Sequence, residues 1–260
     1  MNWIEALILG LVQGLTEFLP VSSSGHLELG KYFLGVDPKN SLVFTVVVHG
    51  ATVLSTIVVF RKDIWEILTG LLDFSWNSSW KFAVSIVISM IPVLIVGLFF
   101  KDYVESFFSG DMRLVGMMLL VTAALLALTH FKKSHERKIN FLDAFIIGIA
   151  QTIAVLPGIS RSGATISTGL LLGNKRELVA RFSFLMVLIP IIGANVLDVY
   201  SGEMSSETGV GTLALVVGFV AAFVAGLAAC KWMINIVKKG KLIYFAAYCL
   251  VIGLLAIFIA

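Results

Sequence analysis

The chain has 260 residues, of which 58% are hydrophobic and 13% are charged, and its formal net charge is +3. This composition, with a mean hydropathy of +0.99, leaves too little polar surface for a folded protein of this size in water, so we predict an integral membrane protein. The positive charges lie in short connections. They therefore indicate how the chain is oriented across a bilayer and do not indicate a nucleic-acid partner.

The predicted elements begin with an internal repeat, because residues 3–35 and 141–173 match at a shift of 138 positions. Identical pairs in this register include Ala6 and Ala144, Gly10 and Gly148, Gln13 and Gln151, Ser22 and Ser160, Ser24 and Ser162, Gly25 and Gly163, Leu34 and Leu172, and Gly35 and Gly173. Such a match indicates that one unit is encoded twice. We predict a single membrane domain, 1–260, whose two repeats cover about 1–131 and about 141–260.

Six stretches reach the roughly 20 apolar residues that a helix needs to cross a bilayer. They lie at about 42–60, 81–100, 113–131, 182–200, 209–230 and 242–260. Segments 3–35 and 141–173 are apolar too, but proline, glycine and serine break each of them into halves of about 16 residues or fewer, which are too short to cross. The predicted fold is therefore an all-α membrane protein with an inverted-topology repeat, in which each half has one re-entrant helical hairpin and three transmembrane helices.

The inversion is predicted from the charges of the connections. The basic connections, expected in the cytoplasm, are 61–62, 132–138, 175–181 and 238–241, whereas 101–113 and 201–207 are expected outside. The first hairpin then enters from outside and the second from the cytoplasm, because three crossings separate them. An inverted repeat of this kind would bring both hairpin tips together near the midplane of the membrane, where such proteins build their sites.

The first tip places a carboxylate inside an apolar segment. Burying Glu17 there costs roughly 2.5–3.5 kcal/mol on insertion scales, so this residue must be paired, hydrated or functional. Gln13 lies four residues earlier, so on a helix the two side chains could jointly hold a ligand, water or cation. These two residues are therefore candidates for a functional site.

Hydroxyl groups and a histidine follow in the same tip. The serines Ser22 to Ser24 either cap a half-helix or offer a nucleophile, for which His26 would be the proton acceptor. His26 could also accept a phosphoryl group itself. His49, inside a transmembrane run, is interpreted as a packing histidine.

The second tip, residues 157–165, is a compact set of donors for phosphate oxygens. Arg161 stands between Ser160 and Ser162, next to glycines that let backbone N–H groups point at one spot. A half-helix beginning near Ser162 would add its positive end to the same place. The alternative is that Arg161 forms a buried structural ion pair with Glu17, and both interpretations are compatible in the resting state.

The two tips resemble those of the undecaprenyl-pyrophosphate phosphatase family, membrane enzymes linked to bacitracin resistance. The resemblance rests on Gln13 to Glu17 as the (Glu or Gln)-x-x-x-Glu element, on Pro20-Val-Ser-Ser-Ser-Gly-His26 and on Pro157-Gly-Ile-Ser-Arg-Ser-Gly-Ala-Thr165, and chain length and hairpin layout agree throughout. It implies hydrolysis of the terminal phosphate of a C55 isoprenyl diphosphate to the monophosphate carrier lipid that cell-wall (peptidoglycan) synthesis reuses. It also implies a bacterial plasma-membrane location, with the site opening to the outer face and the lipid tail between helices.

The resemblance implies a candidate site as well. Ser23 is the expected nucleophile, with His26 and Glu17 as proton acceptor and orienting group; a phosphohistidine at His26 and direct attack by water stay open. The expected substrate-binding residues are Gln13, Ser22, Ser160, Arg161, Ser162 and Thr165. Many members carry glutamate where this chain has Gln13, so that position cannot act as a general base here. The family's divalent cation, Mg²⁺ or Ca²⁺, would find Glu17 as the only obvious carboxylate ligand, so we expect the diphosphate to hold it.

An alternative function is a secondary transporter or flippase for an isoprenyl phosphate or another anion, because transporters often combine inverted repeats with broken helices. Against it, Glu17 and His26 occur on one tip and Arg161 on the other, an asymmetry that favours a reaction centre. A structural scaffold would leave Glu17 and Arg161 unexplained at membrane depth. The Gly-rich helices suit packing within one chain as well as a homodimer.

Overall fold

The computed structural model describes residues 1–36, 42–107, 111–132, 137–193 and 210–259, which fold as helices without a β-strand. The named helices are α1 (Trp3–Thr16), α2 (Ser23–Leu34), α3 (Leu42–Val59), α4 (Arg61–Leu72), α5 (Ser78–Phe99), α6 (Lys101–Ser106), α7 (Met112–Phe131), α8 (Phe141–Ile153), α9 (Arg161–Leu171), α10 (Arg176–Met186), α12 (Thr212–Lys239) and α13 (Ile243–Ile259). The all-helical part of the prediction is confirmed.

Four helices, α3, α5, α7 and α12, are long and apolar enough to cross a membrane. They coincide with four of the six predicted spans. A fifth, α13, has 17 residues and is near the lower limit of a spanning length. These helices identify the chain as a multi-pass membrane protein.

The predicted span at 182–200 is not one continuous helix over its described part. Helix α10 ends at Met186, a turn follows at Val187, and helical residues resume at 188–193. Pro190 explains the break, because a proline removes one N–H donor and its ring clashes with the carbonyl four residues earlier, here that of Met186. Residues 194–200 lie outside the described part of the chain.

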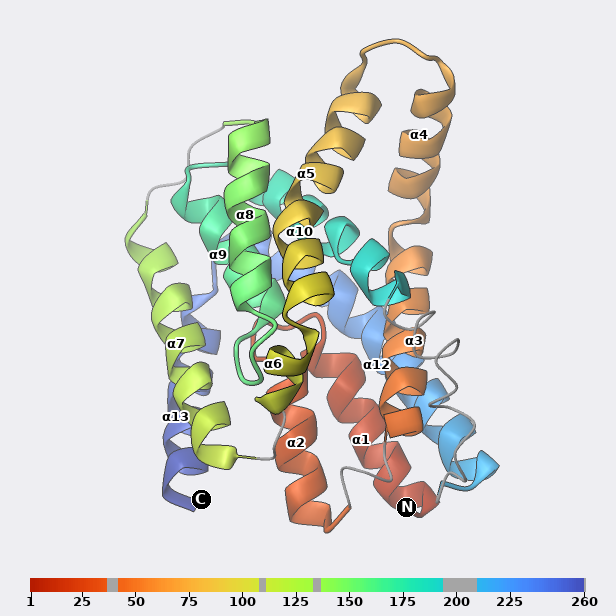
Figure 1. Ribbon diagram of the computed structural model, residues 1–260, viewed down its shortest axis with the longest axis vertical. Helices are drawn as coiled ribbons and strands as arrows, with labels where there is room; N and C mark the ends of the chain where they lie inside the picture. Colours follow the sequence, from red (N-terminus) through yellow and green to blue (C-terminus); the bar gives the residue numbers. More distant parts are fainter. Residues whose placement is uncertain (37–41, 108–110, 133–136, 194–209, 260) are drawn as a thin grey trace.

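The two copies of the repeat form similar helical hairpins, α1 with α2 and α8 with α9. Each begins with a capping box, Asn2 with Glu5 in the first and Asn140 with Asp143 in the second. The two hairpins extend from opposite ends of the molecule, and their turns meet near its middle (Figure 1). This arrangement places the serine-rich turns of both copies together.

Glycines allow the hairpins to pack closely against long helices. A Cβ atom on Gly10 would lie 2.5 Å from the carbonyl oxygen of Gly218 in α12. In the second copy, a Cβ atom on Gly148 would lie 2.3 Å from the carbonyl oxygen of Ser89 in α5. Each hairpin is therefore held backbone to backbone against one long helix, which fixes the depth of its turn.

Gly10→Val is expected to lower the stability of the fold by about 1–3 kcal/mol, because α1 and α12 must separate to admit the side chain. Thermal unfolding in detergent would measure this loss. Gly97→Val is the matched control, since no atom lies within 4 Å of a Cβ atom built at that helical glycine. Equal unfolding temperatures for the two variants would contradict the close packing of α1 on α12.

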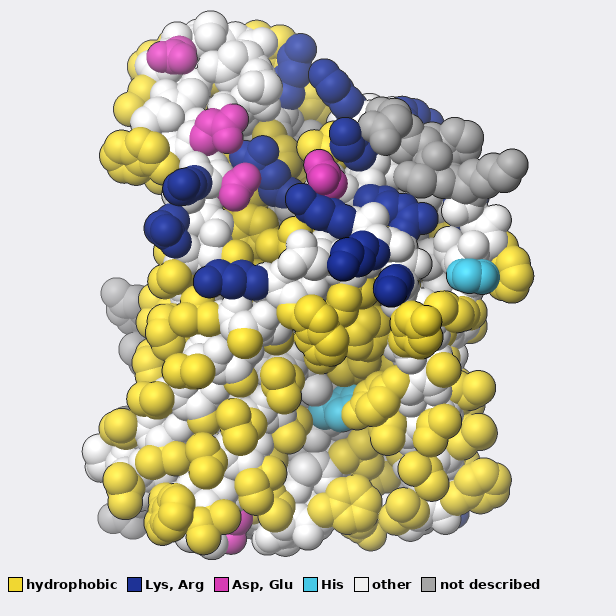
Figure 2. Space-filling model, turned by 180° about the vertical axis from the view of Figure 1, so that it is seen from behind, with side chains coloured by type: hydrophobic (Ala, Val, Ile, Leu, Met, Phe, Trp, Pro, Cys, Tyr) yellow, Lys and Arg dark blue, Asp and Glu magenta, His cyan; other side chains and the backbone are white. Residues whose placement is uncertain are grey.

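Charge is unevenly distributed over the surface. In Figure 2, Lys and Arg side chains form a band across one end of the molecule, and mainly hydrophobic side chains cover the surface beyond this band. Large apolar side chains are exposed on the spanning helices, for example Leu98, Phe131 and Val224. This surface fits a lipid environment, with the cationic band at one membrane boundary.

Candidate active site

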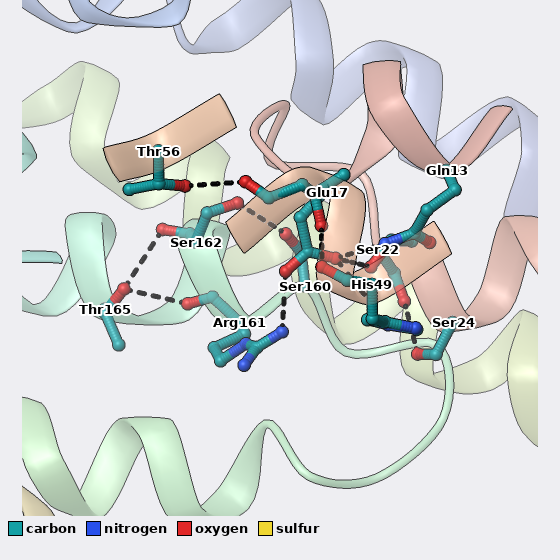
Figure 3. A network of polar contacts seen from close by, with 12 residues as sticks. Gln13, Glu17, Ser22, Ser24, His49, Thr56, Ser160, Arg161, Ser162 and Thr165 are labelled. Atoms are coloured by element: carbon teal, nitrogen blue, oxygen red, sulfur yellow. Dashed lines mark hydrogen bonds and ion pairs between the residues drawn. The ribbon is translucent and has the colours of Figure 1, made fainter. Parts of the chain in front are cut away.

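The carboxylate of Glu17 is the centre of the site and is contacted from both hairpins. Its Oε1 accepts a hydrogen bond from the guanidinium of Arg161 at 2.8 Å. Its Oε2 accepts from Gln13 Nε2 at 2.9 Å and from Ser23 Oγ at 2.7 Å. The side chain of Glu17 is 7% exposed and that of Arg161 is 29% exposed, so the pair is shielded but reachable (Figure 3).

The turn of the first hairpin determines where Ser23 lies. Glu17 follows the last residue of α1, and α2 begins at Ser23 after a short turn. Ser22 caps α2 by accepting the N–H of Gly25, and its φ of +70° is a strained value for a residue with a side chain. This conformation turns the chain sharply, so that the first residue of α2 points back to the last turn of α1.

The turn of the second hairpin presents Arg161 in a similar way. Ser160 caps α9 by accepting the N–H of Gly163, and its own N–H donates to Thr122 Oγ1 of α7 at 3.0 Å. Gly158 has a φ of +98°, and a Cβ atom there would lie 2.4 Å from the carbonyl oxygen of Val115. Arg161 is thus the first residue of α9, held on a turn that is anchored to α7.

A small pocket opens beside this pair of turns. Its polar lining consists of Glu17, Thr52, Thr56, Arg161, Ser162 and Ser183, and its apolar lining of Phe18, Val53, Phe184, Val187, Leu188 and Ile191. Hydroxyl groups and a guanidinium beside apolar side chains suit a ligand with an anionic head and a hydrocarbon tail.

The two histidines of this region occupy unexpected places. His26 bonds through Nδ1 to the carbonyl oxygen of Ser22 and through Nε2 to the hydroxyl of Tyr248, at 2.8 and 2.9 Å. His49 instead directs Nε2 toward Glu17 Oε2, at 3.9 Å. The structure therefore brings His49, interpreted from the sequence as a packing histidine, closer to the central carboxylate than the expected His26.

The other expected residues surround the site without all reaching the pocket. Ser162 lines it and donates to the carbonyl oxygen of Leu19 at 3.2 Å. Thr165 donates to the carbonyl of Arg161, and Ser22 serves as a helix cap. Ser160 also acts as a cap.

Sequence reasoning missed the wall of the pocket that α3 and α10 contribute. On α3, Thr52 and Thr56 line the pocket and His49 faces Glu17, and the three follow the spacing of one helix face, a polar stripe within an apolar span that could have been recognised. Ser183 on α10 carries no comparable signal, because its neighbours in the sequence are aromatic core residues.

The chain offers little to hold a metal ion by itself. Within the described residues, no group of three His, Cys, Asp or Glu side chains converges. Glu17 is the one carboxylate among the described residues that line the pocket; its Oε2 accepts two hydrogen bonds and its Oε1 accepts one, and Gln13 Oε1 is buried without a hydrogen-bond partner among the described residues. One carboxylate and one amide oxygen do not satisfy a divalent cation, which takes six or more oxygen ligands, so the described residues do not form a metal site of their own.

Comparisons with known proteins agree over nearly the full length. The family model of the bacitracin resistance protein BacA matches residues 6–255. The chain is 57% identical over 261 residues to an undecaprenyl-diphosphatase of Bacteroides thetaiotaomicron, covering 99% of this chain and 98% of the relative. It is 57% identical to an undecaprenyl-diphosphatase of Christiangramia forsetii, covering 100% and 99%, and 41% identical to one of Carboxydothermus hydrogenoformans, covering 97% and 95%.

Proposed function

The chain belongs to the bacitracin resistance protein BacA family and is an undecaprenyl-diphosphatase, and we propose that the pocket beside Glu17 and Arg161 is where it hydrolyses its lipid substrate. One observation carries this proposal: a nucleophile candidate from the first hairpin and a phosphate-binding candidate from the second both contact the same carboxylate. A diphosphate bound there would meet both groups at once.

We infer that Arg161 binds the terminal phosphate. Its guanidinium has five N–H donors, and the hydrogen bond to Glu17 leaves others for phosphate oxygens. The N-terminus of α9 adds its positive end and its unpaired N–H groups in the same place. The hydroxyl groups of Ser160 and Ser162 complete the proposed phosphate environment, and Thr165 supports it through its hydrogen bond with Ser183.

In the proposed first step, Ser23 Oγ attacks the terminal phosphorus atom. The bond from phosphorus to the bridging oxygen breaks, undecaprenyl phosphate leaves, and the hydroxyl proton of Ser23 passes to Glu17 Oε2, 2.7 Å away. Water then attacks the phosphoserine and gives a proton to His26, while Glu17 returns its proton to Ser23 Oγ. The bond from phosphorus to Ser23 Oγ breaks, which releases inorganic phosphate and restores Ser23. Arg161 stabilises the negative charge that develops on the phosphoryl oxygens in both steps.

We propose that a divalent cation, Mg²⁺ or Ca²⁺, arrives with the substrate and is held mainly by the diphosphate. A cation between the phosphates would neutralise part of their charge. No step above is assigned to it, because the described residues supply too few oxygen ligands of their own.

For the membrane arrangement, we propose two re-entrant hairpins related by an inverted repeat, each followed by three transmembrane segments. The hairpins that extend from opposite ends in Figure 1 support this proposal. The cationic band in Figure 2 would face the cytoplasm of a bacterial cell, since cytoplasmic loops carry an excess of Lys and Arg. The active site would open toward the outer face of the plasma membrane.

His26→Gln is expected to lower kcat by about 100-fold, the usual scale for loss of a proton-transfer group. His26 lies three residues after Ser23 on α2, so both side chains can share one helix face once the bond to Tyr248 breaks. Tyr248→Phe is the matched control and should change kcat by less than about threefold, because only the hydroxyl bond is removed. Unchanged turnover of His26→Gln would remove His26 from the mechanism.

The function itself is tested by measuring phosphate release from undecaprenyl diphosphate by purified protein in detergent, with Mg²⁺, with Ca²⁺ and with a chelator. We expect one inorganic phosphate per substrate, and loss of release with the chelator. If the protein binds the lipid but releases no phosphate with either cation, the phosphatase assignment fails and the transporter alternative gains the support.

A further inference from the structure

We propose that Ser183 of α10 is an additional substrate-binding residue that donates a hydrogen bond to the diphosphate; this inference rests on the proposed function. Ser183 lies outside both hairpins and 18 residues after Thr165. It nevertheless lines the same pocket as Arg161 and Ser162. Its hydroxyl group is thus placed where a bound phosphate would lie.

The flanking aromatic residues fix the direction of this hydroxyl group. Phe182 packs edge to face on Phe82 of α5, with ring centroids 5.7 Å apart. Phe184 packs on Phe18 and on Phe60, each with ring centroids 5.9 Å apart. Because Phe182 and Phe184 are anchored in this way, α10 cannot rotate without breaking these ring contacts, and Ser183 stays directed at the second hairpin.

The hydrogen bonding of Ser183 differs from that of two other buried helical serines. Ser85 and Ser89 each donate to a carbonyl oxygen of their own helix, which is a common arrangement for helical serines. In the part of the chain that the structure describes, Ser183 makes no such bond and instead lies 2.6 Å from Thr165 Oγ1. Its hydroxyl group is therefore available to the site.

Hydrogen counting shows how this pair can respond to a ligand. Thr165 has one hydroxyl hydrogen and a carbonyl acceptor, that of Arg161, at 2.8 Å; either hydroxyl can donate in the contact with Ser183, and Ser183 is the donor whenever Thr165 donates to Arg161. When a phosphate oxygen enters the pocket, both hydroxyl groups can rotate. Thr165 then donates to Ser183, and Ser183 donates to the phosphate, so that the anion gains a donor without any backbone movement.

The experiment measures KM and kcat for undecaprenyl diphosphate, and Kd for its non-hydrolysable methylene bisphosphonate, in the wild type and in Ser183→Ala. We expect KM and Kd to rise by about tenfold, the scale of a hydrogen bond to a charged group, with kcat nearly unchanged because the bond exists in both ground and transition states. Ser85→Ala is the matched control, since the buried hydroxyl of Ser85 donates within α5. This variant should leave KM and Kd unchanged.

A second comparison, made in protein that carries Thr165→Val, distinguishes direct contact of Ser183 with the substrate from an indirect effect of Ser183 through Thr165. In Thr165→Val, Ser183 can still donate to the phosphate, so adding Ser183→Ala should again raise Kd by about tenfold. If Ser183→Ala has no effect in that background, or none in the wild type, the proposal is overturned. Absence of phosphate release by the wild type would refute the proposed function separately, because binding of the bisphosphonate would still report on Ser183.

Discussion

Arg161→Ala is expected to lower kcat/KM for undecaprenyl diphosphate by about 10³-fold, the loss typical when a charged donor to a phosphoryl group is removed. Arg161 is the only basic side chain, Lys or Arg, among the described residues that line the pocket. Phosphate-release kinetics would measure the loss. Arg161→Lys should lose less, because it keeps the charge but not the planar fork that grips two oxygens.

Folding must be separated from chemistry in this experiment. Arg161→Ala leaves the buried carboxylate of Glu17 without its cation, and breaking a buried ion pair on one side is strongly destabilising. The double variant Glu17→Gln/Arg161→Ala removes both charges and should regain part of the unfolding temperature while remaining inactive. An Arg161→Ala protein that keeps more than about one tenth of wild-type kcat/KM would contradict the assigned role.

Ser23→Ala is expected to lower kcat by at least about 10³-fold, because loss of a nucleophile removes the covalent route and leaves binding intact. The affinity for the methylene bisphosphonate should therefore stay close to that of the wild type. With substrate labelled in its terminal phosphate, rapid acid quenching of the wild type should trap label on the peptide that contains Ser23.

Ser24→Ala is the matched control for Ser23. Ser24 is the next residue of the same helix, and its hydroxyl lies 3.4 Å from Ser22 Oγ and does not contact Glu17. It should retain kcat within about threefold of the wild type. If Ser23→Ala were as active as Ser24→Ala, Ser23 could not be the nucleophile, and attack by His26 or water would replace it.

The hairpins and their turns could be predicted from sequence because the signal is local. The repeat pairs Ser22 with Ser160, and in the structure both residues cap the second helix of their hairpin. The contact between Glu17 and Arg161, 144 residues apart, is the ion pair that the sequence offered only as an alternative to phosphate binding by Arg161. The expectation of one continuous helix at 182–200 was wrong in its described part, because apolar composition outweighed the signal of Pro190.

The wall of the pocket was harder to predict because it depends on long-range packing. His49 and Ser183 belong to α3 and α10, and each reaches the site only because of how its helix packs against the hairpins. An apolar helix with single polar residues looks the same in sequence whether those residues face a site or another helix. Such residues can be assigned to the site only when the depth of the hairpin turn, which the glycine contacts determine, is known.

The central claim is that both hairpins build one active site, and a double-mutant cycle on kcat/KM tests it most directly. Glu17→Gln from the first hairpin and Arg161→Lys from the second are mild enough to leave measurable rates. Because the two residues would act on one phosphate as a unit, the loss in the double variant should be clearly smaller than the product of the two single losses. A loss equal to the product of both single losses would show independent actions and would contradict a shared site.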